Sequence, residues 1–253
     1  MKIAVSGKGG VGKTTLAATL ARVFAEEGKK VLAIDADPDA NLAGALGFEK
    51  PQDIVPLSEM KELIAERTGT EPGKYGSIFK MNPKVDDLPE TIAKSVGPLK
   101  FMVLGGVKKG GGGCICPESV MLKNLIMHLV LSRDEVVILD MEAGLEHLGR
   151  GTASAVDKLL VVVEPGRRSL DTAETVRRLA DDLKLKNIGV VGNKVRHAQD
   201  EEFIRRGLPG FDILGFLPYS EDVIEADLTG RSAYDTSPGT AAAVREIYKK
   251  LIA

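Results

Sequence analysis

A glycine-rich run near the amino terminus carries the most specific chemistry in the sequence. Residues 7–14 read GKGGVGKT and match G-x-x-x-x-G-K-[ST] at every fixed position. The run follows an apolar segment, residues 2–6, and precedes a helical pattern over residues 14–27. In such a loop successive backbone N–H groups turn inward around an anion, and the following helix adds the positive end of its dipole. The run therefore predicts a phosphate-binding loop, in which Lys13 reaches the β- and γ-phosphates of ATP or ADP and Thr14 ligates Mg²⁺.

Carboxylates follow two further apolar segments. Residues 30–35 and 135–140 are both rich in Val, Ile and Leu, and they end in Asp35 and Asp140. A carboxylate at the end of a strand beside a phosphate loop can orient an attacking water molecule. Asp140 is predicted to hold Mg²⁺, directly or through water. The predicted nucleotide-binding set on the loop itself is Gly9, Gly10, Val11, Gly12, Lys13, Thr14 and Thr15.

Two cysteines form a C-x-C pair, Cys114 and Cys116, between a glycine-rich stretch and a helical pattern over residues 117–131. The amino terminus of a helix favours thiolates, which are ligands for soft metals. Two thiolates do not complete a tetrahedral site, but a symmetric dimer would supply four. Tetrahedral sulfur suits Zn²⁺ and a square-planar arrangement suits Ni²⁺. A buried apolar pair and a redox-active pair are the alternatives, although a disulfide between such near neighbours would be strained.

The elements that must position these residues alternate regularly. Apolar segments and helical patterns alternate along the chain, as in βαβ crossovers. The predicted strands are residues 2–6, 30–35, 100–104, 135–140, 158–163, 187–193 and 212–216, and helical patterns include residues 14–27, 117–131 and 170–183. We expect an α/β fold with a doubly wound, mainly parallel sheet flanked by helices. We also expect one domain over residues 1–253, with an insertion at about 48–97, which contains a short helix at 57–67, and a glycine-rich C-x-C loop at about 105–117.

Composition excludes several classes of protein. A net charge of −2 and a pI near 6.0 argue against binding nucleic acid through phosphate neutralisation. No apolar run approaches the length needed to cross a bilayer, and no signal-peptide pattern opens the chain. Two cysteines do not make a disulfide framework. We therefore expect a cytoplasmic protein without a nucleic-acid or membrane partner.

The loop has an additional lysine, Lys8, which makes the run resemble the deviant Walker A motif of the MinD and nitrogenase-iron-protein class of ATPases. The resemblance implies that Lys8 acts in trans, on the nucleotide of a partner subunit, and that ATP holds two copies face to face. It also implies that Asp37 positions the attacking water and that the Gly144 N–H senses the γ-phosphate. By the same resemblance Asn193 recognises adenine and Pro218 lines the base pocket.

A narrower resemblance is to the accessory ATPases that insert nickel into carbon monoxide dehydrogenase. The C-x-C pair carries it, together with residues 140–151 and 163–169. It implies an ATP-hydrolysing homodimer, formed on nucleotide or metal binding, that holds Ni²⁺ or Zn²⁺ through Cys114 and Cys116 of both subunits. The client would be carbon monoxide dehydrogenase. Three alternatives stay open: the related maturation ATPase for acetyl-CoA synthase, an iron–sulfur carrier on the same fold, and a membrane-associated positioning ATPase.

Other polar residues have no assigned role at this point. His147, Arg167 and Arg168 follow predicted strand ends and could serve a metal, a partner chain or solvent. Asp39 and Asn41 are as compatible with a turn as with a site. The final segment, residues 241–253, is predicted to be an amphipathic helix packed on the sheet.

Overall fold

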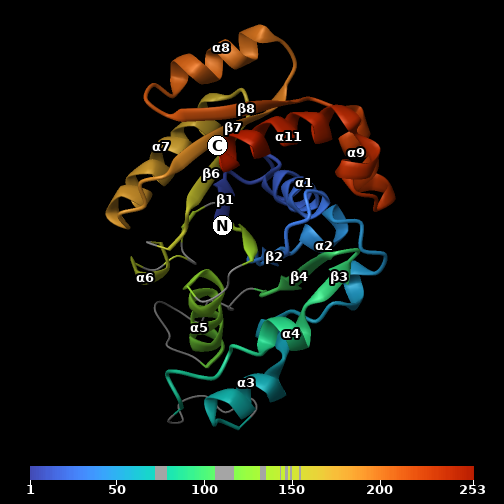
Figure 1. Ribbon diagram of the computed structural model, residues 1–253. Helices are drawn as coiled ribbons and strands as arrows, with labels where there is room; N and C mark the ends of the chain where they lie inside the picture. The colour runs from blue at the N-terminus through green and yellow to red at the C-terminus, as the bar shows by residue number, and fades with distance from the viewer. Residues whose placement is uncertain are drawn as a thin grey trace.

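The computed structural model describes residues 1–71, 79–105, 117–131, 135–142, 144–145, 148, 150–153 and 155–253. In this part of the chain eight strands form one sheet in the order β3-β4-β2-β5-β1-β6-β7-β8 (Figure 1). The strands are β1 (Lys2–Gly7), β2 (Val31–Asp35), β3 (Lys94–Val96), β4 (Leu99–Val103), β5 (Val136–Asp140), β6 (Lys158–Val163), β7 (Ile188–Val195) and β8 (Asp212–Pro218). All neighbours pair in parallel except β3, which is antiparallel to β4. The predicted doubly wound, mainly parallel sheet is confirmed.

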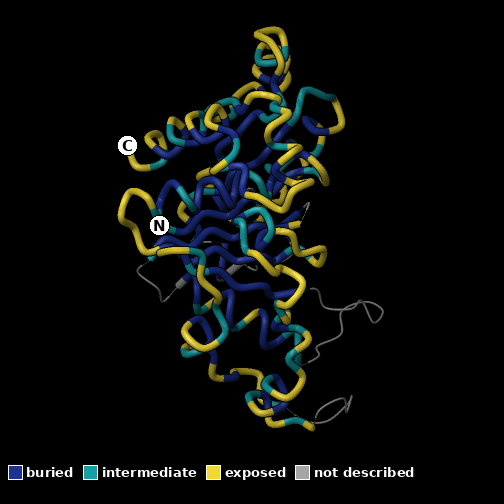
Figure 2. Tube along the Cα trace, turned by 90° about the vertical axis from the view of Figure 1, so that its right-hand side faces the viewer, coloured by how far each residue is buried: buried dark blue, intermediate teal, exposed yellow. Residues whose placement is uncertain are grey.

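Helices connect the strands and cover both faces of the sheet. They are α1 (Lys13–Glu26), α2 (Leu42–Ala45), α3 (Lys61–Thr68), α4 (Leu88–Ile92), α5 (Pro117–Leu131), α6 (Arg150–Ala153), α7 (Arg167–Asp182), α8 (Ala198–Gly207), α9 (Glu221–Thr229), α10 (Ala233–Thr236) and α11 (Pro238–Ile252), with short 3₁₀ turns at Pro51–Asp53 and Leu57–Glu59. Figure 2 shows the buried strands as a central band with exposed segments outside it. No helix among these residues is long and apolar enough to span a membrane.

Alternation along the central strands divides the interior into two cores. In β1, Ala4 belongs to one core, whereas Ile3 and Val5 belong to the other. The Ala4 core also contains the inner faces of α5 and α7, and the Ile3 core contains α1 and α11. Because a helix layer covers each face, both sides of every central strand are apolar, which explains the unbroken runs of Val, Ile and Leu in the sequence.

The elements that could be predicted are those with a local pattern in the sequence. The seven predicted strands are all present, with ends that differ from the prediction by at most two residues. The three-residue strand β3 was not predicted, since Lys94–Val96 has no apolar signature and forms only because β4 offers an edge. Gly28 has φ 74°, and the N–H groups that follow α1 donate to carbonyls of its last turn. Gly28 therefore ends this helix as a C′ glycine does.

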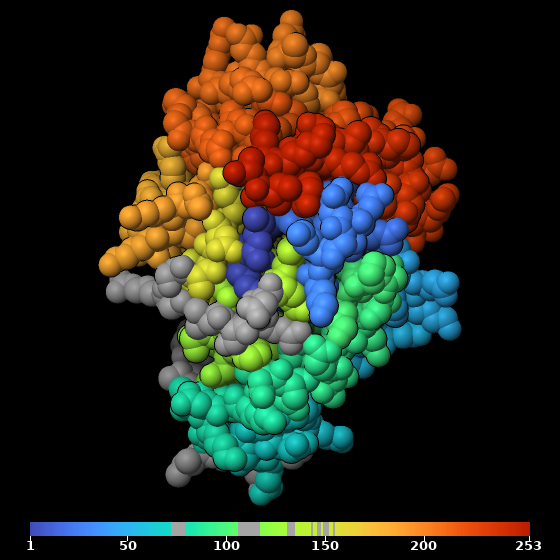
Figure 3. Space-filling view, in the orientation of Figure 1, coloured from blue at the N-terminus to red at the C-terminus, as the bar shows by residue number. Residues whose placement is uncertain are grey.

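The carboxy-terminal helix packs on the sheet, as predicted. Val244, Ile247 and Tyr248 of α11 are buried. Lys250 Nζ donates to the Leu214 carbonyl of β8 at 2.6 Å. In the space-filling view (Figure 3) this last segment of the chain lies next to the first helix. The Phe24 ring of α1 meets Tyr248 edge to face, with 4.8 Å between ring centroids. The packing of α11 therefore supports the helix that follows the phosphate loop.

This contact leads to a stability prediction. Phe24 is only 1% exposed, so Phe24→Ala is expected to lower the free energy of unfolding by about 3–5 kcal/mol through lost burial and a cavity. Phe203, which is 40% exposed, is the matched control, and Phe203→Ala is expected to cost less than about 1 kcal/mol. Urea unfolding of both variants measures the difference. Equal losses would contradict the packing role of Phe24.

Candidate nucleotide and magnesium site

The phosphate-binding run lies between the end of β1 and the start of α1, at the carboxyl edge of the sheet. Two of its glycines are required by space and by backbone angle. Gly7 has φ 148°, and a Cβ there would lie 2.4 Å from the Val162 carbonyl oxygen. Gly12 has φ 93°, and a Cβ there would lie 2.2 Å from Asn193 Nδ2. Larger residues at these positions would force the loop away from its neighbours, so the loop keeps its shape only with glycine.

The two lysines of the motif occupy different environments. Lys13 is buried in the first turn of α1, where an ammonium group can reach phosphates bound by the loop. Lys8 is half-buried at the start of the loop, and none of the residues that the structure describes forms an ion pair with it. Lys8 is thus a cation without an internal partner in the described part of the chain.

Two buried carboxylates lie side by side next to the loop. Asp35 and Asp140 are directly opposite each other in the β2–β5 register. Asp35 Oδ1 accepts the Asp37 N–H at 3.1 Å, and its Oδ2 accepts the Leu42 N–H at 2.8 Å. Asp35 therefore fixes the start of the following loop, a role that sequence reasoning missed because it depends on backbone donors.

Asp140 is 1% exposed, and neither carboxylate oxygen forms a hydrogen bond with the described residues. Burial raises the pKa of Asp140 to about 7, although Thr14 and Lys13 lie near enough to oppose that rise. Burial likewise raises the pKa of Asp35 to about 6, against its backbone hydrogen bonds. A buried carboxylate without a partner, next to a threonine hydroxyl and a phosphate loop, fits a divalent cation. Asp140 and Thr14 are the residues that would hold Mg²⁺.

The loop after β2 has a turn structure. Asp37 Oδ1 accepts the Asp39 N–H at 3.0 Å, and Asn41 Nδ2 donates to the Asp39 carbonyl at 2.7 Å. Asp39 and Asn41 are exposed, whereas Asp37 is half-buried and close enough to Asp140 to raise its pKa. The structure thus brings Asp37 toward the cation site and leaves the other two residues in the turn. That Asp37 orients water stays a prediction.

The segment after β5 is tied to the end of β1. The buried Ser6 hydroxyl donates to the Gly144 carbonyl at 3.0 Å, and the Gly144 N–H donates to the Glu142 carbonyl at 2.8 Å. Ser6 is a second residue that sequence reasoning missed. The predicted γ-phosphate donor, Gly144, is therefore anchored beside the phosphate loop with its N–H in a local turn. His147 lies outside the described residues.

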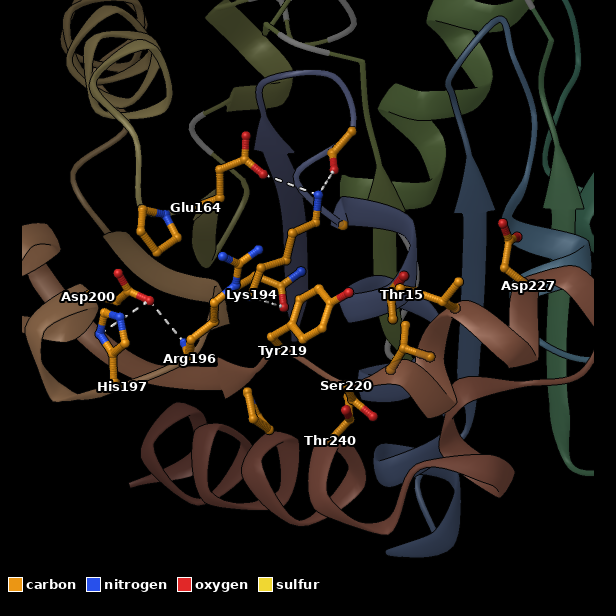
Figure 4. Close-up of a pocket in the computed structure, with 17 residues that line it drawn as sticks. Thr15, Glu164, Lys194, Arg196, His197, Asp200, Tyr219, Ser220, Asp227 and Thr240 are labelled. Carbon is orange, nitrogen blue, oxygen red and sulfur yellow. Dashed lines mark hydrogen bonds and ion pairs between the residues drawn. The ribbon is translucent and has the colours of Figure 1, made fainter.

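A cleft of about 680 Å³ continues from the phosphate loop across the ends of β6, β7 and β8 (Figure 4). Predicted residues Asn193 and Pro218 line it, along with His197 and Tyr219, which were not predicted to do so. Arg196 lies over the Tyr219 ring, 5.1 Å from its centroid. The remaining lining residues are Gly10, Gly12, Thr15, Glu164, Pro165, Lys194, Arg196, Asp200, Ser220, Val223, Ile224, Asp227 and Thr240. The size and position of the cleft suit a nucleoside, whose triphosphate would extend to the loop.

Other predicted residues do not line this cleft or lie outside the described residues. Arg167 and Arg168 begin α7, shortly after the cleft residue Pro165, and are exposed. Cys114 and Cys116 fall within residues 106–116, which lie outside the described residues. In the described part of the chain no group of three or more His, Cys, Asp and Glu side chains could hold a metal ion.

Comparison with known proteins agrees with this geometry. The CobQ/CobB/MinD/ParA nucleotide binding domain family matches residues 2–233. An uncharacterized ATP-binding protein of Methanocaldococcus jannaschii is 51% identical over 91% of this chain and 90% of its own. The carbon monoxide dehydrogenase accessory protein CooC of Rhodospirillum rubrum is 47% identical over 94% of this chain and 91% of its own.

Solved structures share the fold at lower identity. The MinD cell division protein of Aquifex aeolicus has a TM-score of 0.67 at 23% identity, over 99% of this chain and 96% of its own. A putative plasmid partition protein of Borrelia burgdorferi, bound to AMPPNP, has a TM-score of 0.72 at 17% identity, over 99% of this chain and 97% of its own. At these identities the likeness concerns the fold.

The Asp140 carboxyl leads to a prediction about pH. Its pKa is about 7 in the folded chain against an ordinary 3.8, so the native state keeps a proton that the unfolded chain has lost. The free energy of unfolding therefore falls as pH rises through this window. At about pH 8, without nucleotide or Mg²⁺, Asp140→Asn is expected to raise it by about 1–4 kcal/mol. The same variant should lose the Mg²⁺-dependent part of ATP binding.

Urea unfolding between about pH 4 and pH 8, with calorimetric titration of Mg-ATP, measures both effects. Asp182→Asn, at the exposed end of α7, is the control and should change neither. A destabilised Asp140→Asn protein that binds Mg-ATP normally would contradict the cation assignment.

The fold, the phosphate loop, the paired carboxylates and the family match lead to one conclusion. The chain belongs to the CobQ/CobB/MinD/ParA family of nucleotide-binding proteins, and within it is an ATPase of the MinD class that resembles the carbon monoxide dehydrogenase accessory proteins.

Proposed function

We propose that this ATPase is a homodimeric metallochaperone that binds Ni²⁺, or Zn²⁺ in its place, and assists nickel insertion into carbon monoxide dehydrogenase. The observation that carries the proposal is the 47% identity to the accessory protein CooC over 94% of the chain. The C-x-C pair supplies ligands of the right chemistry, because thiolates bind both metals. Four thiolates, two from each subunit, would complete the site.

The described residues around the cysteines support coupling between metal and nucleotide. β4 lies next to β2, with Val103 opposite Asp35. The Leu104 N–H donates to the Asp35 carbonyl at 2.8 Å. The described residues that precede the cysteines in sequence therefore end at the same edge of the sheet as the phosphate loop. They lie beside β2, which carries Asp35, the residue that fixes the Asp37 loop. A change in that loop on ATP binding would act on the flank of the metal-binding segment.

The nucleotide cycle would then control the metal site. ATP would close the dimer, with Lys8 reaching the phosphates bound to the partner subunit, and would bring the four cysteines together. Hydrolysis, with Asp37 orienting the water and Asp140 and Thr14 holding Mg²⁺, would open the dimer and release the metal to the client. Both ligands bias one dimer interface, so each changes the affinity for the other.

Metal stoichiometry and oligomeric state together test this proposal. We expect the reduced protein to bind one Ni²⁺ per two chains, most tightly with ATP, by equilibrium dialysis combined with light scattering. Cys116→Ser and Cys114→Ser should each abolish this binding and leave ATP affinity within about threefold. The control is the reduced wild-type protein with nucleotide and without metal.

Other results would contradict parts of the proposal. Absence of metal under every nucleotide condition would leave a dimerising ATPase with another cargo. A brown protein after anaerobic purification would favour an iron–sulfur carrier. Activation of nickel-free acetyl-CoA synthase, but not of nickel-free carbon monoxide dehydrogenase, would change the client.

Lys8 is tested separately. Because this cation has no ion-pair partner among the described residues, Lys8→Gln is expected to leave ATP binding by the monomer within about threefold. It should abolish ATP-dependent dimerisation, measured by light scattering, because it removes the charge that faces the partner's phosphates. Lys29→Gln, an exposed lysine just after α1, is the control. A Lys8→Gln protein that still dimerises with ATP would overturn the trans role.

A further inference from the structure

Two neighbouring residues of β7 hold the phosphate loop from its outer side. Asn193 Nδ2 donates to the Val11 carbonyl at 2.7 Å, and Lys194 Nζ donates to the Gly10 carbonyl at 2.6 Å. Lys194 Nζ also lies 3.1 Å from Glu164 Oε2, at the end of β6. Figure 4 shows the Lys194 ammonium between Glu164 and a backbone oxygen of the loop. Neither Lys194 nor Glu164 belongs to the phosphate-binding motif.

An irregularity in β7 makes this double contact possible. In a regular strand, consecutive side chains point to opposite faces. Between Gly192 and Val195, however, the β7–β8 register shifts, and Lys194 has φ 57°. Asn193 Oδ1 accepts the Lys194 N–H at 2.8 Å and supports this conformation, which is uncommon for residues other than glycine. The bulge thus directs both side chains to the loop.

The orientation of peptide groups explains what the contact does. A loop that binds an anion through its N–H groups must point the attached carbonyls outward. The two carbonyls held here belong to the Gly10–Val11 and Val11–Gly12 peptide groups, and the flanking glycines have φ 78° and 93°. These are therefore the peptide groups whose N–H groups belong to Val11 and Gly12, and the Val11 N–H also donates to the Lys8 carbonyl at 3.4 Å within the loop. Without outward donors, such a glycine-rich segment would sample many orientations.

We propose that Lys194, oriented by Glu164, is a positioning residue that keeps the phosphate loop in its anion-binding form before nucleotide arrives. The proposal concerns the ATPase site and is independent of the metal cargo. Lys194 acts on the loop backbone and not on the phosphates, because its charge is already matched by Glu164. Their side chains are 43% and 29% exposed, so the contact is a moderate one.

The effect is expected on nucleotide affinity. Lys194→Met should raise the dissociation constants for Mg-ATP and Mg-ADP about three- to tenfold, because the loop must then be ordered on binding. kcat at saturating ATP should stay within about twofold. Lys194→Arg, which keeps a cationic donor, should restore most of the affinity. Calorimetric titration and steady-state hydrolysis measure these values.

The chain offers a matched control. Lys158 of β6 and Asp212 of β8 form another half-exposed ion pair on the same sheet, 2.9 Å apart, at the amino ends of their strands. Lys158→Met should leave nucleotide affinity unchanged. Hydrogen exchange of the nucleotide-free protein gives a readout apart from turnover. Exchange at the Val11 and Gly12 amides should be faster in Lys194→Met and unchanged in Lys158→Met.

The Glu164→Gln variant distinguishes two roles of Lys194: a residue that positions the loop and a cation that attracts phosphate. If Lys194 positions the loop, loss of its partner should weaken ATP binding. Tighter binding in Glu164→Gln would mean that Lys194 acts as a phosphate-attracting cation, and would overturn the proposal. Unchanged affinity and exchange in Lys194→Met, or a fall in kcat without a change in affinity, would also overturn it.

Discussion

The register of the parallel strands is the constraint on which the site depends. With β5 aligned between β2 and β1, Asp35 and Asp140 lie opposite each other beside the strand that leads into the phosphate loop. A shift of one residue in β2 or in β5 would move the carboxylate of that strand to the other face of the sheet. Both faces are fully covered by helices, so such a shift would bury charge in an apolar core. Hydrophobic packing and the geometry of the site therefore specify the same alignment.

The same edge of the sheet contains a buried carboxylate that suits a cation. Asp140 is buried without a hydrogen-bond partner among the described residues, and burial raises its pKa because a charged carboxylate is unfavourable there. A bound cation would remove that cost, since it supplies the missing charge. Asp35 is buried equally but accepts two backbone N–H groups, and so serves as a structural anchor. Two aspartates at equivalent strand positions thus differ in role because only one is already paired.

Tertiary contacts also connect parts of the site that are distant in sequence. Ser6 joins the end of β1 to Gly144, and Leu104 joins β4 to Asp35. Asn193 and Lys194, which line the cleft, join it to the phosphate loop. A structural change at the phosphate loop can therefore reach the loop after β5, the cleft beside β7 and the strand that precedes the cysteines. These connections are the structural support for the proposed coupling between ATP and the metal site.

The amino-acid sequence by itself determined the order of strands and helices, the phosphate loop and the family, because these depend on local patterns such as apolar runs and GKGGVGKT. It also indicated the strand-end aspartates, since carboxyl ends of parallel strands meet at one edge. Only the tertiary structure decided that Asp35 is an anchor while Asp140 is free for a cation, and that Lys194 and Glu164 contact the loop. Those roles depend on hydrogen bonds between residues as many as 184 positions apart, and on a bulge in β7 that has no local signature. The short antiparallel strand β3 belongs with them, because a neighbouring edge and not its own residues makes it a strand.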